Sequence, residues 1–172
     1  GEDFIGICYD DGSLDTLFIA DNKFRNSPSI LKVNDNYVIM AGSDDDKMHA
    51  ISPSGEVIFQ IETGSNVRSE SSFIVIDQEV YAFFGSDDEF VYAVDMNGDA
   101  LDGWPKDIGE DVEDSILFAD IDSNGSPEVI FISSNKVYMY NIDGTLYDRF
   151  PVTHEFPITG TPNVVDLDDD GD

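Results

Sequence analysis

One loop in the second half of the chain concentrates oxygen-bearing side chains at alternate positions. It runs Asp120-Ile121-Asp122-Ser123-Asn124-Gly125-Ser126-Pro127-Glu128. Because they occupy alternate positions, the side chains of Asp120, Asp122 and Asn124 can point toward one centre. Gly125 permits the sharp turn that brings the chain back toward its start. The Ser126 carbonyl and the Glu128 carboxylate can then complete the set. Hard oxygen donors at this spacing suit Ca²⁺, with Mg²⁺ second, so the loop predicts a calcium site. The alternative is a plain acidic turn.

The same signature returns near the last residue of the sequence. It reads Asp166-Leu167-Asp168-Asp169-Asp170-Gly171-Asp172. The carboxylates of Asp166, Asp168 and Asp170 match the three alternate positions that open the first loop. We therefore predict a second calcium site in this segment, built from the same kinds of oxygen donor.

A repeat in the sequence indicates which elements position these loops. Four turns share a glycine followed by an extended run: Gly12, Gly55, Gly98 and Gly144. Successive glycines are 43, 43 and 46 residues apart. A second landmark keeps this phase, because Gly42-Ser43-Asp44-Asp45 and Gly85-Ser86-Asp87-Asp88 are also 43 residues apart. Between the landmarks lie short runs rich in Ile, Val, Phe and Tyr, which are typical of β-strands.

Four short strands in about 43 residues is the size of one blade of a β-propeller. In the third full unit we expect strands at 115–119, 128–133, 136–141 and 145–150. The sequence thus predicts an all-β fold, a partial β-propeller of about four blade-equivalents built from four-stranded antiparallel sheets. The blades expected are residues 27–64, 71–109 and 115–156, with a partial blade at 1–24 and the start of another at 161–172.

The first acidic loop accounts for the one longer spacing in the repeat. Between their first two strands, the earlier units have tight hairpins at 34–36 and 77–79, whereas the third unit has the loop at 120–128. This insertion adds six residues, and the next hairpin, at 133–135, is three residues shorter than its counterparts. The net gain of three residues matches the change from 43 to 46.

The segments 119–130 and 165–172 resemble the FG-GAP repeat of β-propellers, the integrin-alpha-like or VCBS type. In that family such loops bind calcium between the first two strands of a blade. In the first loop the resemblance implies as ligands Asp120, Asp122, Asn124, Ser126 through its carbonyl, and Glu128. In the second it implies Asp166, Asp168, Asp170, and Asp172 through its carbonyl. Asn124 replaces the commoner Asp, and Glu128 stands where Asp is frequent, but both still offer oxygen.

The first two units lack the acidic loop and resemble a different group. Their Gly-Ser-Asp-Asp segments resemble repeats of quinoprotein-type propellers, and residues 101–105 resemble the Gly-Trp-Pro step of secreted bacterial propellers of this group. We expect Trp104 to serve blade packing, and Phe83 and Phe84 to form core between blades. Cys8 lies in a strand-like run, where we expect it to be buried.

Composition excludes several classes of partner. The chain has 172 residues, with 37 Asp and Glu against 8 Lys and Arg, for a formal net charge of −29. No nucleic acid or anionic membrane surface is expected as a partner, because both require clustered Lys and Arg. Apolar runs of about four to six residues are far shorter than the roughly 20 of a membrane helix, so no membrane insertion is predicted. The single cysteine excludes an internal disulfide.

The function that these features favour is a calcium-stabilised interaction or adhesion module of a secreted or cell-surface protein, with the periplasm as an alternative location. We expect a protein or glycan partner on the propeller rim, and further blades, from the same protein or another chain, against the exposed blade faces. Catalysis is not expected, because the sequence lacks a nucleophile elbow, a His-Glu-x-x-His motif and a phosphate-binding glycine loop. Two alternatives remain: the propeller domain of a secreted enzyme (polysaccharide lyase, peptidase or quinoprotein-type), and a structural repeat of a surface assembly or filament.

Overall fold

Strands form where the sequence concentrates β-branched and aromatic residues between turns of Asp, Asn, Ser and Gly. The computed structural model describes residues 2–33 and 35–165. No helix is assigned among these residues, and none of them therefore forms a helix that could cross a membrane. The strands lie in one two-stranded and three four-stranded sheets, all paired antiparallel. The prediction of an all-β fold is confirmed.

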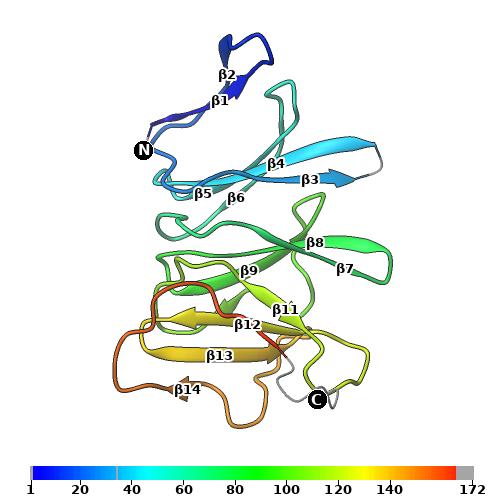
Figure 1. Cartoon of the computed structure of the whole chain (residues 1–172), viewed down its shortest axis with the longest axis vertical. Coiled ribbons are helices and arrows are strands. Elements are labelled where there is room, and N and C mark those ends of the chain that lie inside the picture. The colour runs from blue at the N-terminus through cyan, green and yellow to red at the C-terminus, as the bar shows by residue number, and fades with distance from the viewer. Residues whose placement is uncertain (1, 34, 166–172) are drawn as a thin grey trace.

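The four sheets follow one another along the chain. The N-terminal hairpin consists of β1 (Phe4–Cys8) and β2 (Leu14–Ile19). Sheet I consists of β3 (Ser29–Val33), β4 (Asn36–Ser43), β5 (Lys47–Ile51) and β6 (Val57–Glu62). Sheet II consists of β7 (Ser72–Ile76), β8 (Glu79–Gly85), β9 (Phe90–Asp95) and β10 (Lys106–Asp107). Sheet III consists of β11 (Leu117–Ala119), β12 (Glu128–Ser133), β13 (Lys136–Asn141) and β14 (Val152–Thr153). In Figure 1 they stack in this order from top to bottom.

The strand boundaries reproduce the repeat seen in the sequence. Adding 43 to the residue numbers of β1 and β2 gives the bounds of β5 and β6. The same shift carries Lys47, which begins β5, to Phe90, which begins β9. The N-terminal hairpin therefore corresponds to the third and fourth strands of a sheet.

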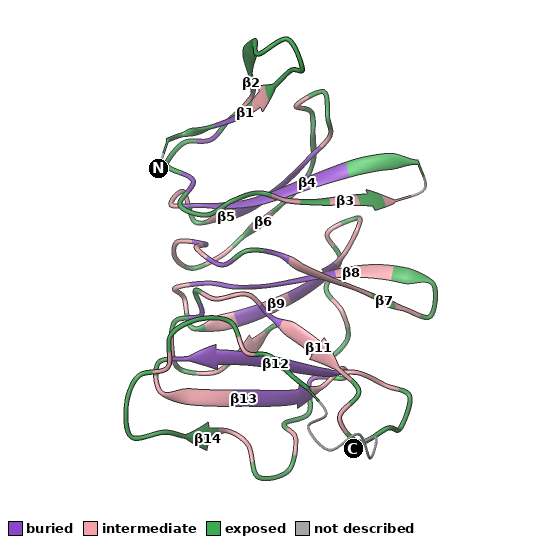
Figure 2. Cartoon of the chain, in the orientation of Figure 1, coloured by how far each residue is buried: buried purple, intermediate pink, exposed green. Residues whose placement is uncertain are grey.

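Apolar side chains on both faces of the second strands form the core between the sheets. Phe83 and Phe84 are neighbours on β8, so they point to opposite faces, and both are fully buried. Phe83 belongs to one cluster with Phe131 of sheet III, whereas Phe84 belongs to another with Met40 of sheet I. A third cluster joins the N-terminal hairpin to sheet I. Figure 2 shows the buried residues running along β4, β8 and β12, so the two phenylalanines form core between sheets, as predicted.

Trp104 links sheet II to sheet III. Its side chain is buried and meets the ring of Phe83 edge-on, with centroids 5.0 Å apart and an interplanar angle of 80°. Its Nε1–H donates a hydrogen bond of 2.9 Å to the carbonyl oxygen of Ile142, in the turn after β13. The predicted packing role of Trp104 is confirmed.

The repeat glycines are required for two separate reasons. Gly12 and Gly55 have φ of +83° and +82°, in the left-handed region that other residues rarely adopt. Gly55 also approaches the preceding sheet so closely that a Cβ atom would overlap the carbonyl oxygen of Leu17 on β2. A Cβ atom on Gly12 would have no other atom within 4 Å, so only the backbone conformation requires glycine there. The turn at Gly55 therefore sets how closely two sheets approach.

The fourth strand of sheet III lies later in the chain than predicted. Residues 145–150, expected as a strand, contribute only an isolated bridge between Leu146 and Tyr140. The chain then turns, with the Phe150 N–H donating to the Tyr147 carbonyl at 3.2 Å and Arg149 at a φ of +68°. Because this turn interrupts the extended run, the strand forms only afterwards, as β14.

The prediction that Cys8 is buried is wrong, because its side chain is exposed. The corresponding residues of sheets I and II, Ile51 and Val94, are 0% and 3% exposed. Those two residues are covered by the preceding sheet, through the clusters that join neighbouring sheets. In the described part of the chain no sheet precedes the N-terminal hairpin, which leaves Cys8 open to solvent.

Removing the ring of Phe83 should destabilise the fold strongly. The Phe83→Ala variant leaves a cavity between sheets II and III, so we expect a loss of about 3–5 kcal/mol in the free energy of unfolding. Urea denaturation followed by fluorescence or circular dichroism measures it. Val75→Ala is the control, since Val75 is 65% exposed and should change stability by less than about 0.5 kcal/mol. Equal effects of the two substitutions would contradict the assignment of Phe83 to the core.

Gly12→Ala and Gly55→Ala form a matched pair that separates backbone strain from close approach. Both variants should lose about 1–2 kcal/mol, because both glycines have positive φ. Gly55→Ala should lose at least about 1 kcal/mol more, because its Cβ meets the Leu17 carbonyl. Chemical denaturation of the two variants side by side tests this, and a Gly12→Ala variant as unstable as Gly55→Ala would refute the packing argument.

Candidate metal centre

The predicted acidic loop joins β11 to β12 in sheet III. β11 ends at Ala119 and β12 begins at Glu128, and these two residues pair directly across the ladder. Residues 120–127 therefore leave the sheet and return to it at the same point. Gly125, with a φ of +87°, and Ser123, with a φ of +55°, turn the chain within the loop. This geometry brings the acidic residues at the two ends of the loop together.

Three carboxylates converge at the base of the loop. Asp120, Asp122 and Glu128 each offer an oxygen atom, and these atoms all lie within 4.8 Å of one another. Among residues 2–33 and 35–165 this is the one group of three acidic, histidine or cysteine side chains that lie so close. The two aspartates are exposed, whereas Glu128 is only 1% exposed. The group therefore lies where the solvent meets the interior of sheet III.

Backbone amides hold the loop folded back on its first residue. The Asp120 carboxylate accepts the N–H of Asn124 at 3.0 Å and that of Gly125 at 2.8 Å. Asp122 also accepts the Asn124 N–H, at 3.2 Å, and the side-chain oxygen of Asn124 accepts the Ser126 N–H at 2.7 Å. These bonds from side chains to nearby amides are typical of Asx turns. Local hydrogen bonding therefore fixes where the first two carboxylates of the site lie.

The surroundings of Glu128 shift the pKa of its carboxyl. Its burial raises the pKa of the carboxyl above the ordinary value, and the charges of Asp122 and Asp120 raise it further. The Ile121 N–H, which donates to Glu128 Oε2 at 2.7 Å, opposes this shift in part. A cation bound among the three oxygens would favour the charged form of Glu128 and relieve the repulsion.

One neighbour of the site comes from outside the loop. Tyr147 follows β13, and its hydroxyl donates to Asp122 Oδ2 at 3.4 Å. Partial burial raises the pKa of the Tyr147 hydroxyl, and the nearby charge of Asp122 adds to the shift. Tyr147 is 25 residues away from Asp122, and the loop signature carries no signal that points to it.

The predicted ligands thus fall into three groups. The structure brings Asp120, Asp122 and Glu128 together. Asn124 and Ser126 lie in the same loop and are joined by the hydrogen bond given above, and their roles as ligands stay predictions. The second predicted loop, with Asp166, Asp168, Asp170 and Asp172, lies outside the described residues.

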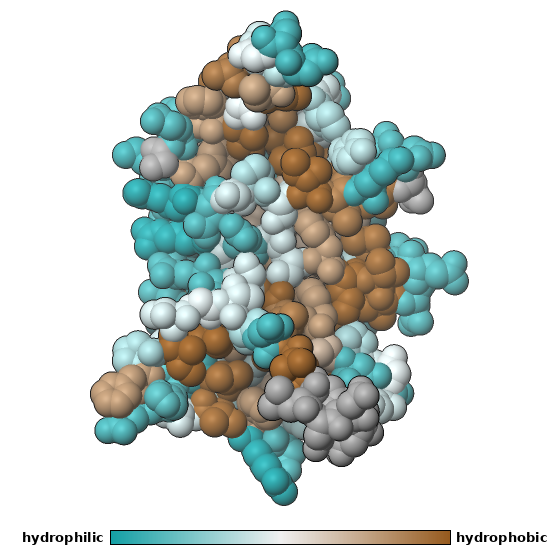
Figure 3. Space-filling view, in the orientation of Figure 1, coloured by the Kyte–Doolittle hydropathy of each residue, from teal (hydrophilic) through white to brown (hydrophobic). Residues whose placement is uncertain are grey.

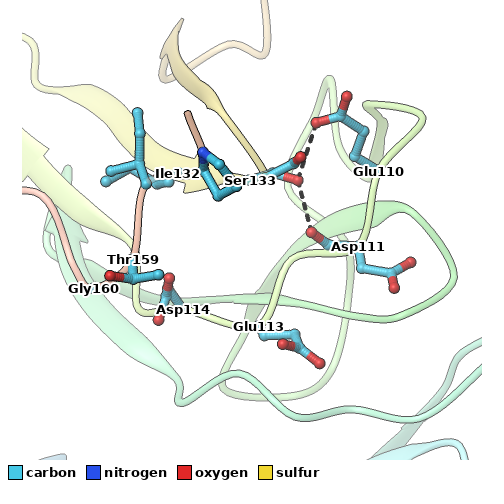
Figure 4. Close-up of a pocket in the computed structure, with 11 residues that line it drawn as sticks. Glu110, Asp111, Glu113, Asp114, Ile132, Ser133, Thr159 and Gly160 are labelled. Carbon is cyan, nitrogen blue, oxygen red and sulfur yellow. Dashed lines mark hydrogen bonds between the residues drawn. The ribbon is translucent and has the colours of Figure 1, made fainter. Parts of the chain in front are cut away.

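A second acidic feature lies in the segment that enters sheet III. An open pocket of about 630 Å³ is lined on one side by Glu110, Asp111, Glu113 and Asp114 (Figure 4). The hydroxyl of Ser133 donates to the Asp111 carbonyl oxygen at 2.7 Å and anchors this segment to the end of β12. Figure 4 shows the carboxylates of Glu110, Asp111 and Glu113 pointing in different directions, so they do not converge as those of the loop do.

Comparison with known proteins was made by sequence and by shape. No family model and no curated protein sequence matches the chain. BamB from Moraxella catarrhalis matches in shape with a TM-score of 0.60 and 18% identity, over 88% of this chain and 44% of that chain. BBS1N, solved in complex with ARL6DN, matches with a TM-score of 0.55 and 16% identity, over 88% of this chain and 49% of that chain. Both matched structures are β-propellers.

The chain has a β-propeller fold. Sheets I, II and III have the form of propeller blades, and the N-terminal hairpin has the form of half a blade. The chain spans a little under half the length of each matched structure. At these identities the likeness shows the fold alone. The acidic loop lies between the first two strands of a propeller blade.

Replacing Glu128 by Gln should stabilise the metal-free protein at neutral pH. The folded-state pKa of Glu128 is raised, so its carboxyl lowers stability as the pH rises from the unfolded value, about 4.5, through the folded value. Glu128→Gln removes this loss and keeps an oxygen that accepts the Ile121 N–H. Urea denaturation in metal-free buffer should therefore show no gain at pH 4 and a gain over wild type at pH 7.

Glu79→Gln is the matched control, because Glu79 is the exposed first residue of β8 as Glu128 is the buried first residue of β12. We expect little difference between the stability of Glu79→Gln and that of wild type at either pH. A Glu128→Gln variant that is less stable than wild type at pH 7 without metal would contradict the raised pKa.

Proposed function

We propose that this chain is a calcium-stabilised β-propeller module through which a secreted or cell-surface protein binds a protein or glycan partner. The observation that carries the proposal is the convergence of Asp120, Asp122 and Glu128 within 4.8 Å, with Glu128 buried. Three carboxylates held this close repel one another unless a cation lies among them. The proposal is a role in binding rather than catalysis, because the cation would occupy these three carboxylates.

The donor set favours Ca²⁺ over other ions. Every group offered is a hard oxygen, from three carboxylates, the Asn124 amide and the Ser126 carbonyl, and no nitrogen or sulfur donor is among them. Ca²⁺ takes six to eight such oxygens in flexible geometry, whereas Mg²⁺ requires a near-ideal octahedron and keeps several waters. When bound, the ion neutralises the carboxylates and crosslinks the loop to the start of β12.

A cation at this loop would stiffen the surface on which a partner binds. The loop lies at one end of the hairpin between β11 and β12, and Tyr147 connects it to the segment that leads into β14. Loops carried on a rigid scaffold are common binding surfaces. BBS1N was solved in complex with ARL6DN, which supports a protein as the kind of partner that a propeller of this shape binds.

Calcium should raise the melting temperature of the chain, and EDTA should reverse the increase. Ca²⁺ binds only the folded loop, so at one hundred times its Kd it adds about 2.7 kcal/mol of stability. For a domain of this size that corresponds to about 5–10 °C. Differential scanning calorimetry in EDTA and in CaCl₂ measures the shift, and the double variant Asp120→Ala, Asp122→Ala should lose it.

The double variant Asp102→Ala, Asp148→Ala is the matched control. It removes the same number of exposed carboxylates, and thus the same charge, from outside the loop. We expect it to respond to calcium as wild type does. If the wild-type melting temperature is the same in EDTA and in CaCl₂, or if both double variants lose the response, the calcium role fails.

A further inference from the structure

Two Asn-Gly pairs occur in the chain, and the structure places them in different surroundings. They are Asn97-Gly98, in the turn after β9, and Asn124-Gly125, in the acidic loop. The backbone nitrogen that follows an asparagine can attack the side-chain amide of that asparagine, which closes a succinimide ring and expels ammonia. Glycine favours this step, because it has no side chain to shield its nitrogen and adopts many backbone conformations. The contacts around each pair then decide which one reacts.

In the acidic loop, the attacking nitrogen is hydrogen-bonded to a carboxylate. The Gly125 N–H donates to Asp120 Oδ2 at 2.8 Å. This distance lies within the range of about 2.6–3.2 Å over which a general base can take a proton from a reacting group. Asp120 therefore lies where a base is needed to accept the proton that the Gly125 nitrogen loses on attack.

The carbonyl group that is attacked has a hydrogen-bond donor of its own. Asn124 Oδ1 accepts the Ser126 N–H at 2.7 Å. Negative charge develops on this oxygen when the nitrogen adds to Cγ, and a donor aimed at the oxygen stabilises that charge. The same hydrogen bond encloses Gly125 in an Asx turn, so it keeps the asparagine side chain folded back toward the backbone that attacks it.

The contacts of the other Asn-Gly pair are of a different kind. The Gly98 N–H donates to the backbone carbonyl oxygen of Asp95 at 3.2 Å, and a carbonyl is not a base. The Asn97 side chain is held by its nitrogen, which donates to Asp95 Oδ2 at 2.9 Å. Asn97 and Asn124 are both exposed, so access to water does not distinguish them. Asn97 is therefore an internal reference for the effect of the acidic loop.

We propose that Asn124 is a site of self-modification, where the loop converts its own asparagine to aspartate or isoaspartate. The Gly125 nitrogen forms a bond to Asn124 Cγ, Asp120 takes the proton from this nitrogen, and the bond from Cγ to Nδ2 breaks. Nδ2 leaves as ammonia with the proton that Asp120 passes on. Water then opens the succinimide: addition at Cγ gives aspartate, and addition at the backbone carbonyl gives isoaspartate.

The reaction needs only water besides the loop. Figure 3 shows a mostly hydrophilic surface where the loop meets the solvent, at the lower right of the view. The product adds one carboxylate to a loop that already brings Asp120 and Asp122 close to Glu128. The proposal is independent of the calcium role, because no step uses a metal ion, and its test is made in EDTA.

Incubation of the chain at neutral pH in EDTA, followed by tryptic digestion and mass spectrometry, measures the reaction. The two asparagines fall on different tryptic peptides, 69–106 and 107–136, so one digest reports both. We expect Asn124 to react at least about tenfold faster than Asn97, because only Asn124 has a base on the attacking nitrogen. The aspartate product is identified by its coelution with the same peptide from an Asn124→Asp variant.

Two substitutions in the loop form a matched pair. Asp120→Asn keeps an oxygen that can accept the Gly125 N–H but removes the base, so it should slow the reaction of Asn124 at least about tenfold. Asp122→Asn removes the same charge from the same loop, and Asp122 accepts the N–H of Asn124 rather than that of Gly125. We expect Asp122→Asn to react as wild type does, and Asn97 to react equally in all three proteins.

A synthetic peptide of residues 118–130 provides a test that needs no substitution. It contains the same Asn-Gly pair without the rest of sheet III, and we expect it to react more slowly than the folded chain. The proposal is wrong if this peptide reacts as fast as the chain or faster. It is also wrong if Asn97 reacts as fast as Asn124, or if Asp120→Asn and Asp122→Asn react at the same rate.

Discussion

Each second strand of this chain must bury both of its faces, and this requirement governs how the sheets are arranged. On β8, Phe83 and Phe84 point to opposite sides and are fully buried, and all six residues of β12 are buried. A sheet with two apolar faces is stable only between two other layers. Because the sheets are stacked, the inner sheets have both faces covered. The repeat of about 43 residues places equivalent residues at the contact between each pair of neighbouring sheets. Within the described residues the N-terminal hairpin is covered on one side only, by sheet I, and apolar residues such as Leu14 and Ile19 are exposed on it.

The candidate metal centre depends on the same burial. β12 is buried from its first residue, so the side chain that begins it, Glu128, is held at the boundary of the core. The loop between β11 and β12 returns two aspartates to this point because Ala119 and Glu128 pair. A carboxylate that is buried beside two others has a raised pKa and a strong affinity for positive charge. Within the described residues the fold therefore gathers three acidic side chains that could hold a cation at one surface loop.

Sequence alone located the features that depend on local chemistry. The spacing of the repeat glycines predicted the fold, since four short strands and their turns take up about 43 residues in each unit, and the acidic loop was found from residue types within nine positions. Features that depend on distant contacts were missed. The turn at 147–150 displaced the fourth strand of sheet III. Cys8 is exposed because no described sheet precedes the N-terminal hairpin, and the residues around Cys8 carry no signal of this. Tyr147 reaches Asp122 only because β13 returns the chain to the loop.

The hydrogen bond from Trp104 to the Ile142 carbonyl joins two sheets that share no strand. In a linear array of such units, the stability of each unit depends on its intrinsic stability and on the contacts with its immediate neighbours. Within residues 2–33 and 35–165, sheets I and II each have a neighbour on both sides, whereas the N-terminal hairpin and sheet III each have one. Opening sheet I or sheet II would therefore break contacts on both of its faces, which makes these two sheets the most cooperative part of the described chain.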